Sequence, residues 1–167
     1  MSRIAWDMDR LEAMRGLLDG YGMRSIAVAE GDETVWSWHA AGADRLAAVY
    51  SVTKSVLSLL IGIAIQEGLV GGIDDRIGDY LELPKDAHPR LSKIRLRHLL
   101  TMTSGLDWPD FDKPYWAMKR SADAVRFVLS RPVAHEPGTV FAYNTGGSHL
   151  LAAILAATAG TTVLDYA

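Results

Sequence analysis

Ser51 and Lys54 stand three residues apart at the start of a long apolar run, in the stretch "VYSVTKSVLSLLIGIAIQEG". If a helix begins near Ser51, the two side chains lie next to each other on one face of it. A serine hydroxyl beside an uncharged lysine amine is a nucleophile beside a general base. The first candidate chemistry is therefore attack by Ser51 on a carbonyl carbon.

The position of Lys54 favours the uncharged amine. The N-terminal end of a helix carries partial positive charge and an apolar helix face removes water from an ammonium group, and both effects lower a lysine pKa. The same helix end would stabilise the oxyanion that forms when Ser51 attacks a carbonyl. An alternative stays open here, because Ser51 can be an ordinary N-cap and Lys54 a solvated first-turn residue.

The other candidate groups are better explained structurally. Ser148, in "GGSHL", lacks the final glycine of the Gly-x-Ser-x-Gly nucleophile elbow, since Leu150 occupies that position, and fits a helix start. Ser104, in "TMTSGL", fits a turn after a short helix. The five histidines show no metal-binding spacing, and the glycine pairs lack the lysine of a phosphate-binding loop. The sequence predicts no metal site and no cofactor.

Composition limits the function classes. The 167 residues carry a formal charge of −3, which argues against a nucleic-acid or anionic-membrane surface. The absence of cysteine excludes disulfides and thiolate catalysis. The longest apolar run, residues 56–65, is shorter than the roughly 20 residues of a membrane span, and "MSRIAWDMDRLEAMRG" has no signal-peptide core. We therefore expect a soluble, cytoplasmic protein.

The elements that must position the candidate groups are predicted as helices and one hairpin. Two β-prone runs, "RSIAVAE" and "TVWSWHA", are joined by a turn at Gly31 and Asp32 and predict the hairpin. Apolar periodicity and capping residues predict the helices. They are residues 7–19, 51–66, a short helix in 96–105, residues 121–129, with Ser121 as the cap, residues 147–159 and one turn in 161–167.

The connections and the most apolar helices carry further expectations. Residues 69–83 are predicted as a loop anchored by Ile73, Ile77, Tyr80 and Leu81, and residues 106–116 are too rich in Pro and Asp for regular structure. The helices at 51–66 and 147–159 are apolar nearly all round and should be buried on several sides. One hairpin is too little to cover them, so we expect the chain to be the front part of a larger domain.

Four segments, taken in order, resemble the β-lactamase-related serine hydrolases. They are "YSVTKSVLSLLIGIAIQEGLV", "IDDRIGDYL", "IRLRHLLTMTSGL" and "PGTVFAYNTGGSHLLAAIL", and the likeness runs from about residue 26 to the end. This family includes class C β-lactamases, penicillin-binding D-alanyl-D-alanine peptidases, esterases and amide hydrolases. Within this family, the segments "HLLTMTSGLDW" and "YNTGGSHLL" look most similar to the branch of the esterases and the 6-aminohexanoate-dimer hydrolases.

The resemblance implies a fold and a set of roles. The fold is α+β, β-lactamase/transpeptidase-like, represented here by an N-terminal helix, the first β-hairpin of the antiparallel sheet and the helical subdomain. Ser51 becomes the acylated nucleophile, Lys54 its proton-accepting partner and Tyr143 the tyrosine that moves the proton. Asn144 and Thr145 are the implied substrate contacts.

The sequence departs from the family pattern in two places. Two residues after the tyrosine, where the family keeps an asparagine for the substrate amide, stands Thr145, and Asn144 stands one place early. This favours esters or small amides over β-lactams. The third family motif, Lys-Thr-Gly or His-x-Gly on a strand, is not among residues 1–167. We therefore expect the N-terminal portion of a single domain, impaired by itself because one oxyanion donor is missing.

The expected partners follow from this assignment. They are a small-molecule ester or amide substrate, and either a second copy or a complementing C-terminal segment at the exposed hairpin edge, with no nucleic acid and no membrane. Two alternatives from other classes remain at this point. One is a non-catalytic β-lactamase-like scaffold with a binding or regulatory role, and the other is a helical binding protein in which Lys54 is exposed and remote from Tyr143.

Overall fold

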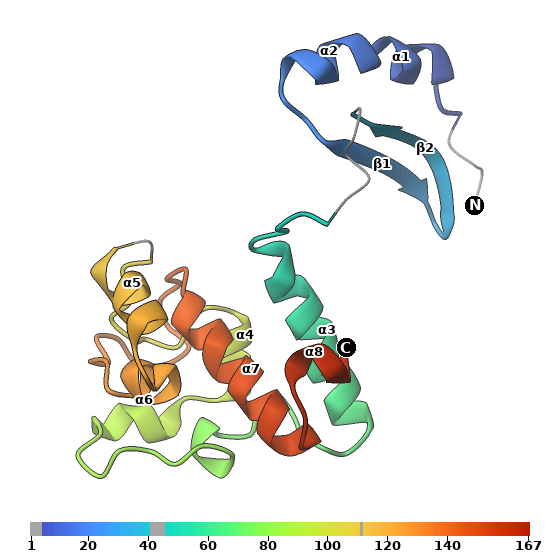
Figure 1. Cartoon of the computed structure of the whole chain (residues 1–167). Helices are drawn as coiled ribbons and strands as arrows, with labels where there is room; N and C mark the ends of the chain where they lie inside the picture. Colours follow the sequence, from blue (N-terminus) through green and yellow to red (C-terminus); the bar gives the residue numbers. More distant parts are fainter. Residues whose placement is uncertain (1–4, 41–45, 111) are drawn as a thin grey trace. The chain divides into compact units, whose positions relative to one another are not determined.

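The computed structural model describes residues 5–40, 46–110 and 112–167. The chain forms two compact units, Met1–Ala48 and Val49–Ala167 (Figure 1). Each unit has its own buried cluster of apolar side chains. None of the helices in the described ranges is long and apolar enough to cross a membrane.

The first unit contains two short helices and the predicted hairpin. The helix expected over residues 7–19 is divided at Met14 into α1 (Met8–Ala13) and α2 (Arg15–Gly20). Strands β1 (Ser25–Glu30) and β2 (Glu33–His39) pair antiparallel around the glycine turn, which confirms the hairpin. Because side chains alternate along a strand, Trp36 and Trp38 share one face, and both are buried with Leu18 of α2.

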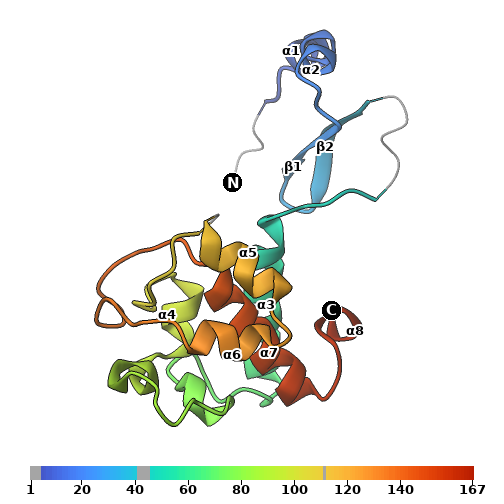
Figure 2. The same ribbon diagram turned by 60° about the vertical axis from the view of Figure 1, so that its left-hand side comes forward.

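The second unit is helical. Its helices are α3 (Val52–Gln66), α4 (Leu96–Leu100), α5 (Lys113–Arg120), α6 (Ala124–Leu129), α7 (Thr145–Ala159) and α8 (Val163–Tyr166), with 3-10 turns at Ile77–Asp79 and Pro89–Lys93. Helix α7 contacts α3, α4, α5, α6 and α8 and is the central helix of the unit (Figure 2). The unit is therefore organised around one apolar helix.

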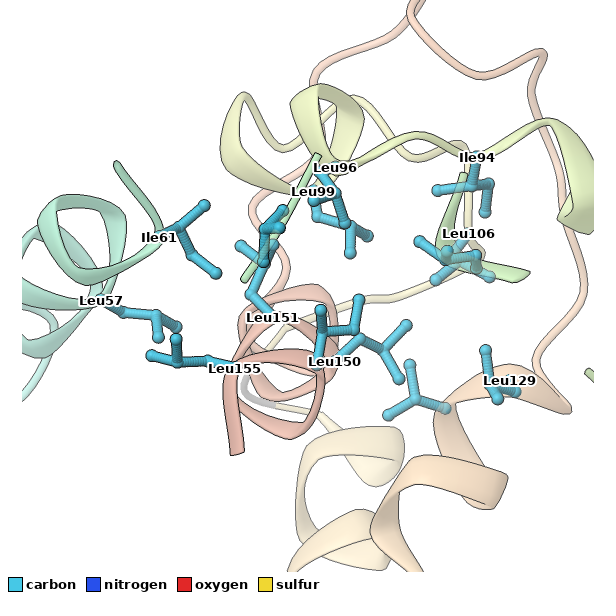
Figure 3. Close-up of a cluster of buried hydrophobic side chains, with 14 of the residues drawn as sticks. Leu57, Ile61, Ile94, Leu96, Leu99, Leu106, Leu129, Leu150, Leu151 and Leu155 are labelled. Carbon is cyan, nitrogen blue, oxygen red and sulfur yellow. The ribbon is translucent and has the colours of Figure 1, made fainter. Parts of the chain in front are cut away.

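The apolar face of α7 forms the main core. Leu150, Leu151, Ile154 and Leu155 are each 3% exposed or less. Leu57 and Ile61 of α3 face this helix, while Ile94, Leu96, Leu99 and Leu106 cover another side (Figure 3). Burial of several such side chains, each worth about 1.5–3 kcal/mol, fixes α3 and α7 against each other.

The expectation for α3 is only partly met. One face, formed by Leu57, Leu60, Ile61 and Ala64, is buried. A second apolar face is exposed, because within this unit α7 packs against one side of α3 only. This exposed face of α3 consists of Val52, Val56, Leu59 and Ile63, which are between 44% and 69% exposed.

Two predictions about the connections need correction. Ile77 is fully buried and Tyr80 and Leu81 pack against the core, but Ile73 is 44% exposed and does not anchor the loop. The turn at this position is held by hydrogen bonds from Gly72 N and Tyr80 OH to the Asp75 carboxylate. The stretch 106–116 is not irregular throughout, because α5 begins at Lys113. Proline at the start of a helix costs no hydrogen bond, so Pro114 is tolerated there. Phe111 lies outside the described residues.

Three predicted helix boundaries also shift. The N-cap of α6 is Asp123, whose carboxylate accepts a hydrogen bond from Arg126 N at 2.9 Å, and Ser121 ends α5 instead. Helix α4 ends at Leu100 rather than near Gly105. Helix α7 begins at Thr145, two residues early, because Asn144 supplies the cap. Asp123 and Asn144 are side-chain N-caps, and they mark where α6 and α7 begin.

Candidate active site

Ser51 lies at the start of α3, with its hydroxyl uncommitted to the helix. It occupies the N-cap position, but its backbone is helical (φ −72°, ψ −8°) and its side chain makes no capping hydrogen bond. The preceding residue, Tyr50, has a φ of +45°, a left-handed conformation that is unusual for a residue with a side chain. The ordinary N-cap explanation of Ser51 is therefore wrong.

Ser51, Lys54 and Tyr143 converge. The Oγ atom of Ser51 lies 2.6 Å from the phenolic oxygen of Tyr143, and Lys54 Nζ donates a long hydrogen bond of 3.4 Å to Ser51 Oγ. The Lys54 amine also lies 5.0 Å from the centre of the Tyr143 ring, within the range of a cation–π contact. Ser51 is exposed, whereas Lys54 and Tyr143 are half-buried. The alternative that placed Lys54 far from Tyr143 is excluded by this geometry.

The surroundings of Tyr143 make its phenol more acidic. The hydrogen bond with Ser51 is the largest cause that lowers the pKa of Tyr143, and the hydrogen bond and charge of Lys54 lower it further. Partial burial and the negative charge of Asp110 act in the opposite direction without reversing the net shift. A phenol with a lowered pKa gives up its proton more easily than an ordinary tyrosine does. It is therefore suited to exchange a proton with the serine hydroxyl.

Tyr143 comes to this place through backbone contacts with a segment 40 residues earlier. Ala142 N donates a hydrogen bond of 2.9 Å to Met102 O. Met102 follows α4 and has a φ of +56°, so the chain turns sharply at that residue. Gly138 N donates to Thr103 O at 2.7 Å on the same side. The turn after α4 thus supports the extended segment that carries Tyr143.

Gly105 allows the two segments to approach closely. Its carbonyl oxygen accepts hydrogen bonds from Ala134 N at 2.8 Å and from His135 N at 3.2 Å. A Cβ atom at residue 105 would lie 2.2 Å from the backbone oxygen of His135, and the φ of Gly105 is +76°. Both the space and the backbone conformation therefore require glycine.

The two predicted substrate contacts have structural tasks here. Asn144 is 2% exposed; its Oδ1 accepts a hydrogen bond from Gly147 N at 2.8 Å and its Nδ2 donates to Ser104 Oγ at 3.4 Å. The amide of Asn144 is therefore committed to hydrogen bonds that cap α7, and its contact with a substrate stays a prediction. Thr145 donates from both its backbone nitrogen and its hydroxyl to Asp110. Its predicted substrate contact competes with this pairing.

Sequence reasoning missed the residues that hold Tyr143. Asp110 and Trp108 lie in a segment without a periodic pattern, Met102 lies in the predicted short helix, and their partners are 35 to 40 residues away in the chain. The Trp-Pro-Asp sequence after the short helix α4 was the one local signal for this anchor, but spacing alone does not connect it with residue 145. Within the described ranges, no group of three or more His, Asp or Glu side chains could hold a metal ion.

Comparison with known proteins assigns the family. The model of the family described as Beta-lactamase matches residues 12–167, which is most of the chain. The chain belongs to the beta-lactamase family. This confirms the resemblance drawn from the four sequence segments. Since the match includes Ser51, Lys54 and Tyr143, the three converging residues lie inside the family domain.

Solved structures agree on the fold of this family member. EstCE1, described as a hydrolase with promiscuous acyltransferase activity, matches with a TM-score of 0.72 and 20% identity, covering 95% of this chain and 49% of its own. An octameric penicillin-binding protein homologue from Pyrococcus abyssi gives 0.67 and 19%, covering 96% and 41%. A Bacillus anthracis protein provisionally assigned as a 6-aminohexanoate-dimer hydrolase gives 0.70 and 19%, covering 89% and 43%.

These comparisons confirm the predicted fold class. The chain is α+β and has the β-lactamase/transpeptidase-like fold in the part of it that these 167 residues represent. Identities of 19–20% with these three structures bear on the fold alone. The chain spans less than half of the length of each of the three structures. Activity and substrate are therefore taken up as proposals.

Proposed function

We propose that this chain carries the nucleophilic centre of a serine hydrolase that acts on an ester or small amide through an acyl-serine intermediate. The observation that supports it is the convergence of Ser51 Oγ, Tyr143 OH and Lys54 Nζ. Hydrogen-bond reach between a nucleophile and a base, with a third group beside them, is the signature of an activated serine.

The reaction can be written on these three groups. The Tyr143 phenolate, stabilised by Lys54, accepts the proton of Ser51 as Oγ bonds to the carbonyl carbon and the carbonyl oxygen becomes an oxyanion. The backbone N–H of Ser51, at the start of α3, is an oxyanion donor. When the carbonyl re-forms, the bond to the leaving group breaks, and the departing alcohol or amine takes the proton from Tyr143.

Deacylation uses the same groups in reverse. A water molecule gives its proton to Tyr143 as its oxygen attacks the acyl carbon. The tetrahedral intermediate then expels Ser51 Oγ, which recovers the proton, and the carboxylic acid leaves. One phenol thus serves first as base and then as acid in each half of the cycle, which requires a pKa closer to neutral than that of an ordinary tyrosine.

Esters and small amides are the favoured substrates. The amide of Asn144 is occupied as a helix cap, and Thr145 has a hydroxyl that is paired with Asp110, so neither side chain supplies an unoccupied amide beside Tyr143. A peptide or β-lactam substrate carries an amide group next to the reacting carbonyl, and the enzyme must bind that amide by hydrogen bonds. A simple ester has no such amide and needs fewer hydrogen bonds from the enzyme. The description of EstCE1 as a hydrolase with acyltransferase activity is in line with acyl transfer from such substrates.

A covalent probe tests the proposal. A fluorophosphonate or a p-nitrophenyl ester should modify Ser51, identified by mass spectrometry of the modified peptide. Ser51→Ala should abolish the modification, and Lys54→Ala should slow it by about 100-fold or more, because the phenolate that accepts the proton loses the group that stabilises it. Ser148→Ala is the matched control and should react at the wild-type rate. Modification of Ser148 instead, or none at Ser51, would refute the proposal.

The exposed face of α3 favours a second candidate function. A helix with apolar side chains left uncovered can serve as a docking surface in a non-catalytic scaffold. If this second function is correct, no acyl-serine should form with any activated ester. The chain should also associate with a second copy or a complementing segment, at this face or at the hairpin edge. The probe experiment and a sedimentation measurement over a range of concentrations separate the two candidates.

A further inference from the structure

Asp110 connects the segment after α4 with the first residue of α7. Its Oδ1 atom accepts hydrogen bonds from Trp108 Nε1 at 2.6 Å and from Thr145 N at 2.8 Å. Its Oδ2 atom accepts a third hydrogen bond from Thr145 Oγ1 at 3.0 Å. A carboxylate that receives hydrogen bonds on both oxygens holds its donors in a defined geometry, because bonds to a charged acceptor are the stronger ones.

Tyr143 is only two residues away from this anchor. The intervening residue, Asn144, is buried and bonded to both Gly147 and Ser104, so the connection between Thr145 and Tyr143 has little freedom. On the other side of Tyr143, Ala142 is hydrogen-bonded to Met102. The tyrosine is thus held on both sides by one segment, residues 102–110.

The indole of Trp108 adds a steric contact to the same anchor. A Cβ atom at Gly146 would lie 2.8 Å from carbon atoms of the Trp108 ring, so the ring lies directly against the first turn of α7. Asp110 fixes this ring through Nε1. Its negative charge is also favourable at the N-terminal end of a helix. Asp110 therefore secures the first turn of α7 by hydrogen bonds, charge and the placement of Trp108.

We propose that Asp110 is a positioning residue for Tyr143, which it keeps within hydrogen-bond distance of Ser51 Oγ by holding the first turn of α7. The catalytic consequence rests on the proposed function, whereas the positioning itself does not. The charge of Asp110 opposes ionisation of Tyr143. Any help that Asp110 gives to ionisation of Tyr143 must therefore come from geometry. The direction in which the pKa of Tyr143 changes in an Asp110 variant then separates the two effects.

The first experiment measures ionisation of the Tyr143 phenol without any substrate. Tyrosinate absorbance is followed during an alkaline titration of the chain and of Asp110→Asn, and the corresponding curve with Tyr143→Phe is subtracted in each background. If Asp110 acts only through its charge, Asp110→Asn lowers the pKa of Tyr143. If it positions the phenol, the variant raises the pKa, because the contacts with Ser51 and Lys54 are lost. A lower or unchanged pKa would overturn the proposal.

The second experiment measures the rate at which the probe modifies Ser51. Misplacement of a reacting group by about 1 Å can cost about 100-fold in rate, so we expect Asp110→Asn to be slower by about 10- to 100-fold. Asp123→Asn is the matched control, since it also removes a carboxylate cap from a helix in the same unit. Because asparagine and aspartate are about equally good N-caps, it should change the midpoint of thermal unfolding little and keep the wild-type rate.

A double-mutant cycle distinguishes positioning from a general structural effect. In the Tyr143→Phe background, Asp110→Asn should slow the modification of Ser51 by less than about threefold, because the residue that Asp110 positions is already absent. An equal factor in both backgrounds would contradict the proposal. Failure of the wild-type chain to react at all would refute the proposed function, and the titration would still decide whether Asp110 positions Tyr143.

Discussion

The Oγ atom of Ser51 and the phenolic oxygen of Tyr143 lie 2.6 Å apart although 92 residues separate them in the chain. This contact joins the first turn of α3 to the segment that precedes α7. Both helices are fixed by the same apolar core, so the contact depends on burial that is remote from the two oxygen atoms. The proposed chemistry and the stability of the helical unit are therefore linked.

Replacement of Tyr143 tests the chemical part of this link. Tyr143→Phe keeps the ring but removes the oxygen that contacts Ser51, and we expect the probe to modify Ser51 about 100- to 10,000-fold more slowly, the usual range for loss of a general acid–base group. The midpoint of thermal unfolding should change little, since the phenol oxygen is not part of the core. Tyr21→Phe, at a side chain that is 79% exposed, is the control. Equal rates for both variants would exclude a role for Tyr143.

The pH dependence of the same reaction follows from the lowered pKa of Tyr143. In the proposed mechanism the Tyr143 phenolate accepts the proton of Ser51, so the rate should rise as pH rises through the pKa of Tyr143. Because the contacts with Ser51 and Lys54 lower this pKa from the ordinary value of 10.0, the rise should be centred below pH 10. Stopped-flow measurements with a p-nitrophenyl ester from pH 6 to 10.5 give the profile.

Two controls are needed to interpret the pH profile. In Tyr143→Phe the rise assigned to the phenol should be absent. Background hydrolysis of the ester by hydroxide is measured with Ser51→Ala and subtracted. A profile that is identical in the chain and in Tyr143→Phe would mean that another group takes the proton.

Gly105 and Gly68 form a matched pair for the close approach that supports Tyr143. Both have a left-handed backbone, with φ of +76° and +75°, but only at Gly105 would a Cβ atom meet another atom within 4 Å. Gly68→Ala should cost about 1–2 kcal/mol of unfolding free energy for the backbone conformation. Gly105→Ala should cost a further 1–3 kcal/mol or so, as for other overpacked sites.

Urea unfolding followed by circular dichroism measures this difference. Gly105→Ala should also slow the modification of Ser51, because a shift of the His135 backbone is transmitted to the segment that ends at Tyr143. Gly68→Ala should leave that rate unchanged. Equal free energies of unfolding for the two variants would show that the approach at Gly105 is not tight.

The two apolar faces of α3 can be compared with one substitution on each. Ile61 is 1% exposed and Leu59 is 69% exposed. Ile61→Ala should lower the unfolding free energy by about 2–5 kcal/mol through loss of burial and a cavity, whereas Leu59→Ala should remain within about 0.5 kcal/mol. Urea unfolding at several protein concentrations gives both values. A large cost for Leu59→Ala would mean that another surface covers this face of α3.

Several features were predictable from neighbouring residues. The Ser51–Lys54 pair needs only the geometry of one helical turn, and the hairpin needs only alternating side chains around a glycine turn. The terminal helix α8 likewise follows from Thr162, whose hydroxyl accepts a hydrogen bond from Asp165 N. In each case the interacting groups lie within a few residues of each other, so the local sequence contains the whole interaction.

The helix starts show where local prediction stops. Ser121 and Asp123 are both acceptable N-caps, and the sequence favoured Ser121 while the structure uses Asp123. Proline and aspartate near Lys113 suggested irregular structure, yet α5 begins there, because Met118 and Pro114 are buried against the rest of the unit. Where two helix starts have similar local free energies, the packing of the helix against the rest of the unit selects one of them. The local sequence pattern does not contain that packing.

By itself the sequence determined the hairpin and most of the helices of this protein, its family resemblance and the pairing of Ser51 with Lys54. The tertiary structure decided that Tyr143 meets Ser51, that Asn144 is a buried cap and that Asp110 holds the first turn of α7. Helical periodicity and capping act over one or two turns of chain. Contacts across 35 to 92 residues depend instead on how apolar faces pack, and only the assembled core brings those groups together.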